Sequence, residues 1–187
     1  ALGLGFILFE ISMIQRLVLF LGYPTYSLTV TLASLLVFTG IGALWSNRLV
    51  ERARVVVPIV FLVLCGLTAF YEFGLDSLKD GLLAEGLAVR VIVTVVVLAP
   101  LGVCLGMFMP LGLNLVNGLS DHPDEYVAWS WAVNGFFSVI GSVLTTILAM
   151  SIGFRSVQLV ALGVYAVAVV AYLRLRNRAA QIALARV

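Results

Sequence analysis

The chain has 187 residues, of which 63% are hydrophobic and 11% are charged, and its mean hydropathy is +1.17. About a quarter of the residues of a soluble domain are charged, so this composition excludes a soluble globular protein and predicts an all-α, polytopic membrane protein. The apolar runs are continuous, whereas a transmembrane β-barrel alternates over segments of about ten residues. The net charge of +2 gives no indication of a nucleic-acid partner.

Six hydrophobic spans follow one another along the chain, and we expect each to cross a bilayer as a helix of about 20 residues. They form one transmembrane domain over residues 1–187. We expect its partners to be the lipid bilayer and other protein domains or subunits of a membrane assembly. Because no charged region precedes the first span, it is not a signal peptide, and we expect the chain to be a piece of a longer polypeptide. The spans cover residues 2–21, 26–45, 55–73, 87–116, 128–150 and 157–173.

The first span carries charged and polar residues at membrane depth. Glu10 lies near its middle, and Gln15 and Arg16 follow half a span later. An ionised side chain at such depth costs at least about 2.5–3.5 kcal/mol. Glu10 and Arg16 are six positions apart, roughly 240° around a helix, so they do not pair with each other. Other helices must therefore supply their partners, which predicts that this helix lies at the centre of the bundle.

Orientation follows from the arginines, which are ten of the eleven basic residues. The segment after the second span contains Arg48, Arg52 and Arg54, and the C-terminal tail contains Arg174, Arg176, Arg178 and Arg186. Basic segments favour the cytoplasmic side, so both termini are predicted to be cytoplasmic, in a bacterial inner membrane. The acidic segment 75–85 then faces outward, either as a short surface helix or as an ordinary loop.

The fourth span contains two prolines and several glycines. Proline removes a backbone donor and disturbs the preceding turn, so a helix break is predicted over Pro100, Gly106, Pro110 and Gly112. An interrupted helix leaves backbone groups free to bind a polar ligand, as in many transporters. The alternative is a kinked or tilted helix that fits its neighbours.

Small and polar residues form strips on the second and fifth spans. Such strips allow helix backbones to approach closely in lipid, and the alternative is a polar path for a ligand. The helix-packing residues are predicted to be Ser27, Thr31, Ser34, Gly135, Ser138, Gly141 and Ser142.

The deepest polar groups define a candidate intramembrane polar site. Its central member, Glu10, either binds a cation or relays protons, or it ties helices together as a neutral, hydrogen-bonded group. The two asparagines of the set either cap a broken helix or hydrogen-bond across helices. The candidate residues are Glu10, Gln15, Arg16, Asn114 and Asn134.

Nothing in the sequence indicates catalysis or metal binding. Cys65 and Cys104 lie inside apolar runs, and His122 is the single histidine. No Cys/His ligand set, phosphate loop or nucleophile–base constellation is visible. We therefore expect no catalytic residue, no metal and no cofactor in this chain.

Several stretches resemble the membrane part of bacterial spermidine-synthase-like membrane proteins, in the same order along nearly the whole chain. They are residues 3–16 with 19–28, Gly40-Ile-Gly42, Gly106-Met-Phe-Met-Pro-Leu-Gly112, Trp129-Ser-Trp-Ala-Val-Asn-Gly135 and Ser138-Val-Ile-Gly-Ser142. Two positions depart from the family pattern. Tyr23 stands where a histidine is common, and Phe108 replaces the first proline of a Gly-Met-Pro-Phe-Pro-Leu-Gly motif.

The resemblance implies that an aminopropyltransferase-like domain precedes Ala1, and none of it is present here. It implies a non-catalytic membrane domain that anchors and organises that cytoplasmic domain or a membrane complex. The alternative is a transporter-like half-bundle for a polyamine or another small cation. In that reading, spans one to three and four to six are two inverted three-helix repeats, an arrangement known from transporters of the major facilitator type.

Overall fold

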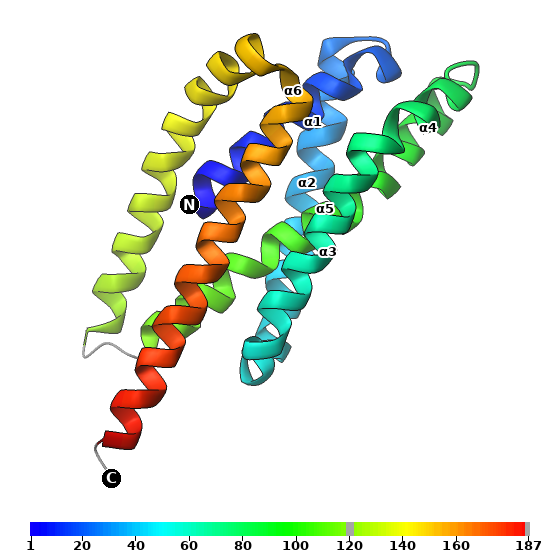
Figure 1. Ribbon diagram of the computed structural model, residues 1–187. Coiled ribbons are helices and arrows are strands. Elements are labelled where there is room, and N and C mark those ends of the chain that lie inside the picture. The colour runs from blue at the N-terminus through cyan, green and yellow to red at the C-terminus, as the bar shows by residue number, and fades with distance from the viewer. Residues whose placement is uncertain (119–121, 186–187) are drawn as a thin grey trace.

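The computed structural model describes residues 1–118 and 122–185, and in these ranges every regular element is a helix (Figure 1). The prediction of an all-α protein is therefore confirmed. The elements are α1 (Leu2–Leu21), α2 (Pro24–Ser46), the 3-10 helix η1 (Asn47–Arg52), α3 (Ala53–Phe73), α4 (Leu75–Leu82), α5 (Leu87–Asn117) and α6 (Pro123–Ala185).

Two glycines in the left-handed region stand where the chain reverses its direction. Gly22 follows α1 with φ at 90°, and Gly153 interrupts α6 with φ at 79° and ψ at 156°. Because a side chain makes this conformation costly, glycine is the residue that allows both reversals. Gly153 divides α6 into a first segment, 123–152, and a second segment, 154–185, which Figure 1 shows running in opposite directions.

Among the described residues, four helical stretches are long and apolar enough to cross a membrane: Leu2–Leu21, Pro24–Phe73, Leu87–Asn117 and Asp124–Arg178. The second and fourth contain 50 and 55 residues, more than twice the length that one crossing needs. Each of these two turns back on itself, the second at η1 and the fourth at Gly153 (Figure 1). We call the end of the bundle where α4 lies the α4 end, and the opposite end the η1 end.

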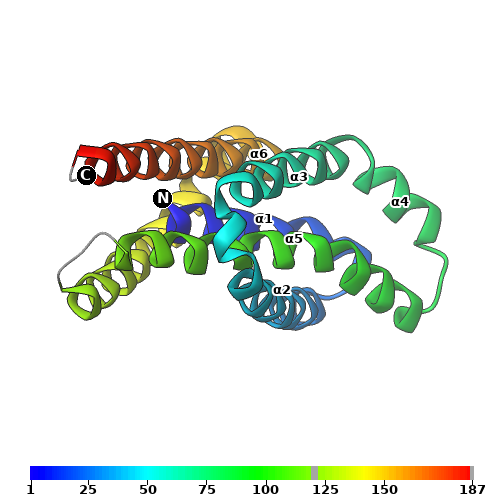
Figure 2. The ribbon, with the colours of Figure 1, turned by 90° about the horizontal axis from the view of Figure 1, so that it is seen from below.

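Helix α1 lies inside the bundle, with α2 and α5 on one side and the second segment of α6 on the other (Figure 2). Half of its residues are buried, including Glu10, Leu8, Phe9 and Met13. Helices α1 and α6 approach each other closely because glycines stand at their contact. A side chain at Gly3 would overlap the backbone of Asn134, and Gly141 lies against Leu4 and Ile7.

Helices α2 and α5 pack backbone to backbone through glycines on both sides. A Cβ atom at Gly106 would overlap the carbonyl group of Thr39, and one at Gly42 would overlap the carbonyl group of Val103. This contact is the kind expected in lipid, where small residues bring helices together.

The predicted break in the fourth span is corrected by the structure, because α5 is one continuous helix through Pro100 and Pro110. Each proline removes one intrahelical hydrogen bond, but the tight contact with α2 at Gly102 and Gly106 holds the helix between the two prolines. Tertiary packing therefore overrides the local preference. The acidic segment forms the short helix α4, over residues 75–82.

Candidate functional site

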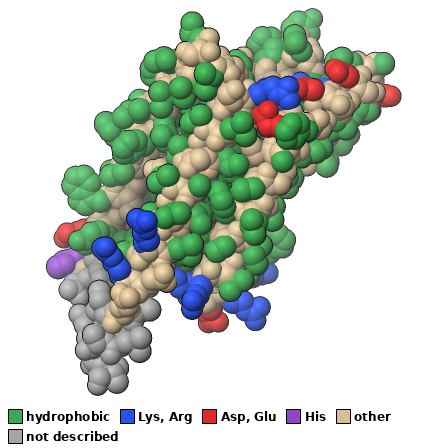
Figure 3. Space-filling model, viewed as in Figure 1, with side chains coloured by type: hydrophobic (Ala, Val, Ile, Leu, Met, Phe, Trp, Pro, Cys, Tyr) green, Lys and Arg blue, Asp and Glu red, His purple; other side chains and the backbone are tan. Residues whose placement is uncertain are grey.

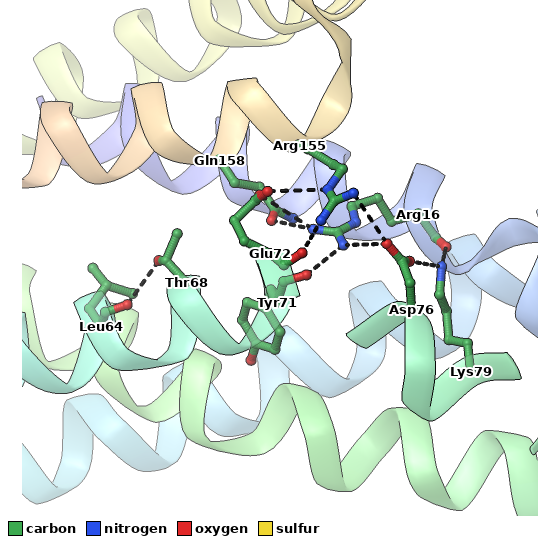
Figure 4. A network of polar contacts seen from close by, with 9 residues as sticks. All are labelled: Arg16, Leu64, Thr68, Tyr71, Glu72, Asp76, Lys79, Arg155 and Gln158. Atoms are coloured by element: carbon green, nitrogen blue, oxygen red, sulfur yellow. Dashed lines mark hydrogen bonds and ion pairs between the residues drawn. The ribbon is translucent and has the colours of Figure 1, made fainter. Parts of the chain in front are cut away.

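A cluster of charged side chains joins α1, α3, α4 and α6 at the α4 end, and Arg16 lies at its centre (Figure 4). The Arg16 side chain is only 6% exposed. Its Nη1 donates to Gln158 Oε1 at 2.7 Å, and its Nη2 donates to the backbone carbonyl of Tyr71 at 2.5 Å. The guanidinium group also lies 3.7 Å from Glu72 Oε1 and 3.6 Å from Asp76 Oδ2.

Arg155 and Lys79 complete this ionic cluster. Arg155 Nε lies 3.2 Å from Glu72 Oε2, its Nη1 lies 3.7 Å from Asp76 Oδ2, and its Nη2 donates to the Glu72 carbonyl. Lys79 Nζ lies 2.7 Å from Asp76 Oδ1. Three cations therefore share two carboxylates, and the formal charge of the cluster is +1.

The charged groups of the cluster are paired with one another. Every nitrogen that carries the charge of Arg155, and both terminal nitrogens of Arg16, already has a carboxylate or carbonyl partner. Asp76 lies in α4, outside the long apolar helices, and its pKa is held below the ordinary value, chiefly by the hydrogen bond from Lys79. Charges arranged in this way cross-link helices. Among the described residues, the buried Nε2 of Gln158 is a donor of this cluster that has no hydrogen-bond partner.

Lys79 of the cluster, and Arg90 at the start of α5, bind carbonyl groups in the last turns of α1. Lys79 Nζ donates to Arg16 O at 3.3 Å, and Arg90 Nη1 donates to Phe20 O at 3.0 Å. Because carbonyl groups at a helix C-terminus carry partial negative charge, cations there are favourable. They hold the end of α1 against α4 and the start of α5.

Glu10 is buried, with 8% of its surface exposed, and it lies apart from the ionic cluster. Among the described residues it has no hydrogen bond and no ion pair. Ser27 Oγ donates to Ile14 O at 2.5 Å. Since α2 runs antiparallel to α1, Thr31 lies at the level of Glu10, one turn further along α2. The buried hydroxyl of Thr31 has no partner among the described residues either.

The other members of the predicted polar site are dispersed. Gln15 is exposed on α1, and Asn114 is exposed and donates to Pro110 O of its own helix at 2.9 Å. Asn134 is half-buried and approaches Gly3 at the start of α1. The structure therefore brings none of these three side chains together with Glu10 or Arg16.

The predicted packing residues differ in burial between α2 and the first segment of α6. Ser27, Thr31 and Ser34 are buried on α2, and Ser138 and Gly141 face α1. Gly135 is exposed, and a Cβ atom there would meet nothing within 4 Å. Ser142 is half-buried and donates to Val139 O.

Two adjoining hollows open beside α1 toward the η1 end. The larger, of about 430 Å³, has walls from α1, α2, α5 and α6, and the smaller measures about 330 Å³. Both are predominantly apolar, and neither is lined by Glu10. They share Leu2, Met109 and Asn134.

The sequence-based prediction of a polar site missed five members of the ionic cluster: Glu72, Asp76, Lys79, Arg155 and Gln158. Glu72 and Asp76 were a usable signal, because two carboxylates close together at the end of an apolar span need a cation. The identity of that cation depends on how α1, α3 and α6 are placed, which the sequence does not display.

The helical stretches and their apolar surfaces define the class of the protein as an α-helical membrane protein. Comparison of the chain with protein-family models, with curated proteins and with solved structures finds no match in any of the three. No group of three potential metal ligands occurs among the described residues.

Proposed function

We propose that this chain is a non-catalytic integral-membrane domain that anchors and organises a cytoplasmic domain of the spermidine-synthase-like kind or a membrane complex. The observation that supports it best is the ionic cluster. Its charged groups pair with one another and connect four helices, as suits a rigid scaffold.

In this proposal the chain crosses the bacterial inner membrane six times. The reversals at η1 and Gly153 divide the two longest apolar stretches into two crossings each. Both termini then lie on the same side as η1. The arginines of η1 and of the C-terminal segment support a cytoplasmic position for that side.

The transporter alternative receives less support. A path for a small cation needs an aqueous cavity with anionic or polar groups along it. Glu10 lines neither hollow, and the hollows are largely apolar. The two inverted repeats would also have to move relative to each other, and the ionic cluster ties α1, α3 and α4 to α6.

A soluble fluorescent reporter joined ahead of Ala1 tests the anchoring role. We expect the fusion to stay in the membrane fraction after an alkaline wash and the reporter to remain on the cytoplasmic side. Release into the soluble fraction, or a reporter on the outer side, would overturn the proposal.

Spermidine binding to the purified chain tests the alternative. We expect no saturable binding in nanodiscs, either to the wild type or to Glu10→Gln. Saturable binding to the wild type that disappears in Glu10→Gln would instead favour a cation path centred on α1.

A further inference from the structure

The two hollows beside α1 have the shape and chemistry of a site for hydrocarbon chains. Their volumes, about 430 and 330 Å³, are in the range of small-molecule sites, roughly 300–1,000 Å³. Few polar side chains face them, and Asn134 borders both. Each hollow contains a glycine that opens it further. A Cβ atom at Gly40 in the larger hollow, or at Gly112 in the smaller one, would meet nothing within 4 Å.

The smaller hollow leads toward a basic segment of α6. Ala171 and Leu175 line it, and Arg178 lies seven and three positions further on, so it belongs to the same helix face one turn nearer the η1 end. Arg174 and Arg176 flank Leu175, and the sequence contains no acidic residue after Glu125. Figure 3 shows basic side chains at this end of the molecule, beside the apolar lateral surface.

The opposite wall of the hollow is less basic. It is formed by the first segment of α6, which contributes Ser130 and Val133 and begins with the exposed carboxylates Asp124 and Glu125. A negatively charged group at the mouth is therefore attracted to the Arg178 wall and repelled by the acidic one. The distribution of charge fixes the side on which such a group sits.

We propose that the adjoining hollows hold the acyl chains of one anionic phospholipid, with its phosphate group at Arg178 and Arg174. Apolar walls suit hydrocarbon chains. Basic pockets between transmembrane helices are known to bind anionic headgroups, and positive charge at the mouth distinguishes such a lipid from a zwitterionic one. The proposal requires insertion in a membrane, and it does not depend on what the domain anchors.

Native mass spectrometry of the purified chain tests this site, with phosphatidylglycerol and phosphatidylcholine of identical acyl chains as probes. We expect one phosphatidylglycerol per chain, bound at least tenfold more tightly than phosphatidylcholine. Gly112→Leu fills the smaller hollow and should weaken this binding at least tenfold. Gly66→Leu is the matched control, since Gly66 also has open space around its Cβ position and lines neither hollow, and it should leave binding unchanged.

Charge variants test the headgroup separately from the hollows. Arg178→Gln should weaken phosphatidylglycerol binding about fivefold, given roughly 1 kcal/mol for each basic residue near an anionic headgroup, and should leave phosphatidylcholine unaffected. Glu125→Gln should strengthen phosphatidylglycerol binding. Glycerol 3-phosphate should not compete, because the acyl chains supply much of the affinity. Equal binding of both lipids, or Gly112→Leu binding as well as Gly66→Leu, would overturn the proposal.

Discussion

At the scale of single residues, the ionic cluster has a graded exposure that separates its members. Arg16 is 6% exposed at the side chain, whereas Arg155, which binds the same two carboxylates, is 54% exposed. Charges buried in a common network are stable only while their partners are present. Exposed charges are screened by water and contribute little. The two arginines should therefore differ widely in their effect on stability.

We expect Arg16→Met to lower the free energy of unfolding by about 3–5 kcal/mol, because it leaves Glu72 without its buried cation. Arg155→Met is the matched control and should lower it by no more than about 1 kcal/mol. Reversible unfolding in mixed detergent micelles measures both. The double variant Arg16→Met with Glu72→Gln should recover part of the loss. Equal losses for Arg16→Met and Arg155→Met would contradict a cluster centred on Arg16.

Glu10 presents the opposite case, since it is buried without a partner among the described residues. An amide of the same shape avoids the cost of placing a charge there. We therefore expect Glu10→Gln to change the free energy of unfolding by less than about 1 kcal/mol or to raise it. The same unfolding assay measures this. A loss of several kcal/mol would mean that Glu10 has a cationic partner in the folded protein.

At the scale of helices, the α2–α5 contact depends on the absence of side chains at particular positions. Gly106 and Gly112 lie on the same helix, but a Cβ atom at Gly106 would overlap the Thr39 backbone, whereas Gly112 has open space. A backbone atom cannot move aside as a side chain can. Substitution at Gly106 must therefore separate the helices.

We expect Gly106→Ala to destabilise the protein by about 1–3 kcal/mol through overpacking. Gly112→Ala should raise stability by roughly 0.5–1 kcal/mol, because alanine loses less backbone freedom in a helix. Unfolding of the two variants side by side measures the difference. If Gly106→Ala were as stable as Gly112→Ala, the close packing of α2 against α5 would be refuted.

Helix α4 is attached to the bundle by charge, which gives its docking a predictable dependence on pH. The pKa of Asp76 is lowered in the folded protein, first of all by the Lys79 hydrogen bond. Its contribution to stability is therefore fully present above its ordinary pKa of about 4. It is lost as the pH falls through the lower, folded value.

From this group we expect no change in thermal midpoint between pH 8 and about pH 5, followed by a fall below about pH 4. Asp76→Asn should start with a lower midpoint at neutral pH and lose that part of the acid dependence. Thermal unfolding in nanodiscs across this pH range measures both proteins. Parallel curves for the wild type and Asp76→Asn below pH 4 would show that Asp76 does not anchor α4.

At the scale of the whole molecule, periodicity and composition were sufficient for the helical class and for the central place of α1. The need to pair Arg16 correctly predicted a central helix, because α1 packs between α6 and the α2–α5 pair. The partner expected for Glu10 is not found among the described residues. The partners of Arg16 could not be predicted from the sequence, since Glu72, Asp76 and Gln158 lie more than 50 residues away and meet it only through tertiary placement. The predicted break at the prolines of α5 was wrong for a similar reason. Packing against α2 preserves the helix that the prolines locally disfavour.

The number of membrane crossings can be tested from the positions of the helix ends relative to the membrane. If α2 and α3 each cross the bilayer, η1 and α4 lie on opposite sides. If the stretch from Pro24 to Phe73 only enters the membrane and returns, η1 is its deepest point and is not reached from the side opposite α4. Gly81 in α4 has open space for a new side chain, and Arg48 in η1 is exposed, so both positions accept a cysteine.

We expect Gly81→Cys to react with a membrane-impermeant maleimide in intact cells, whereas Arg48→Cys and Arg178→Cys react only after the membrane is opened. The native Cys65 and Cys104 are first replaced by alanine, and that background is the unlabelled control. This pattern follows from six crossings with the arginine-rich segments inside. Labelling of Gly81→Cys and Arg48→Cys from the same side would exclude six crossings. It would show that the Pro24–Phe73 stretch enters the membrane and returns to the side from which it came.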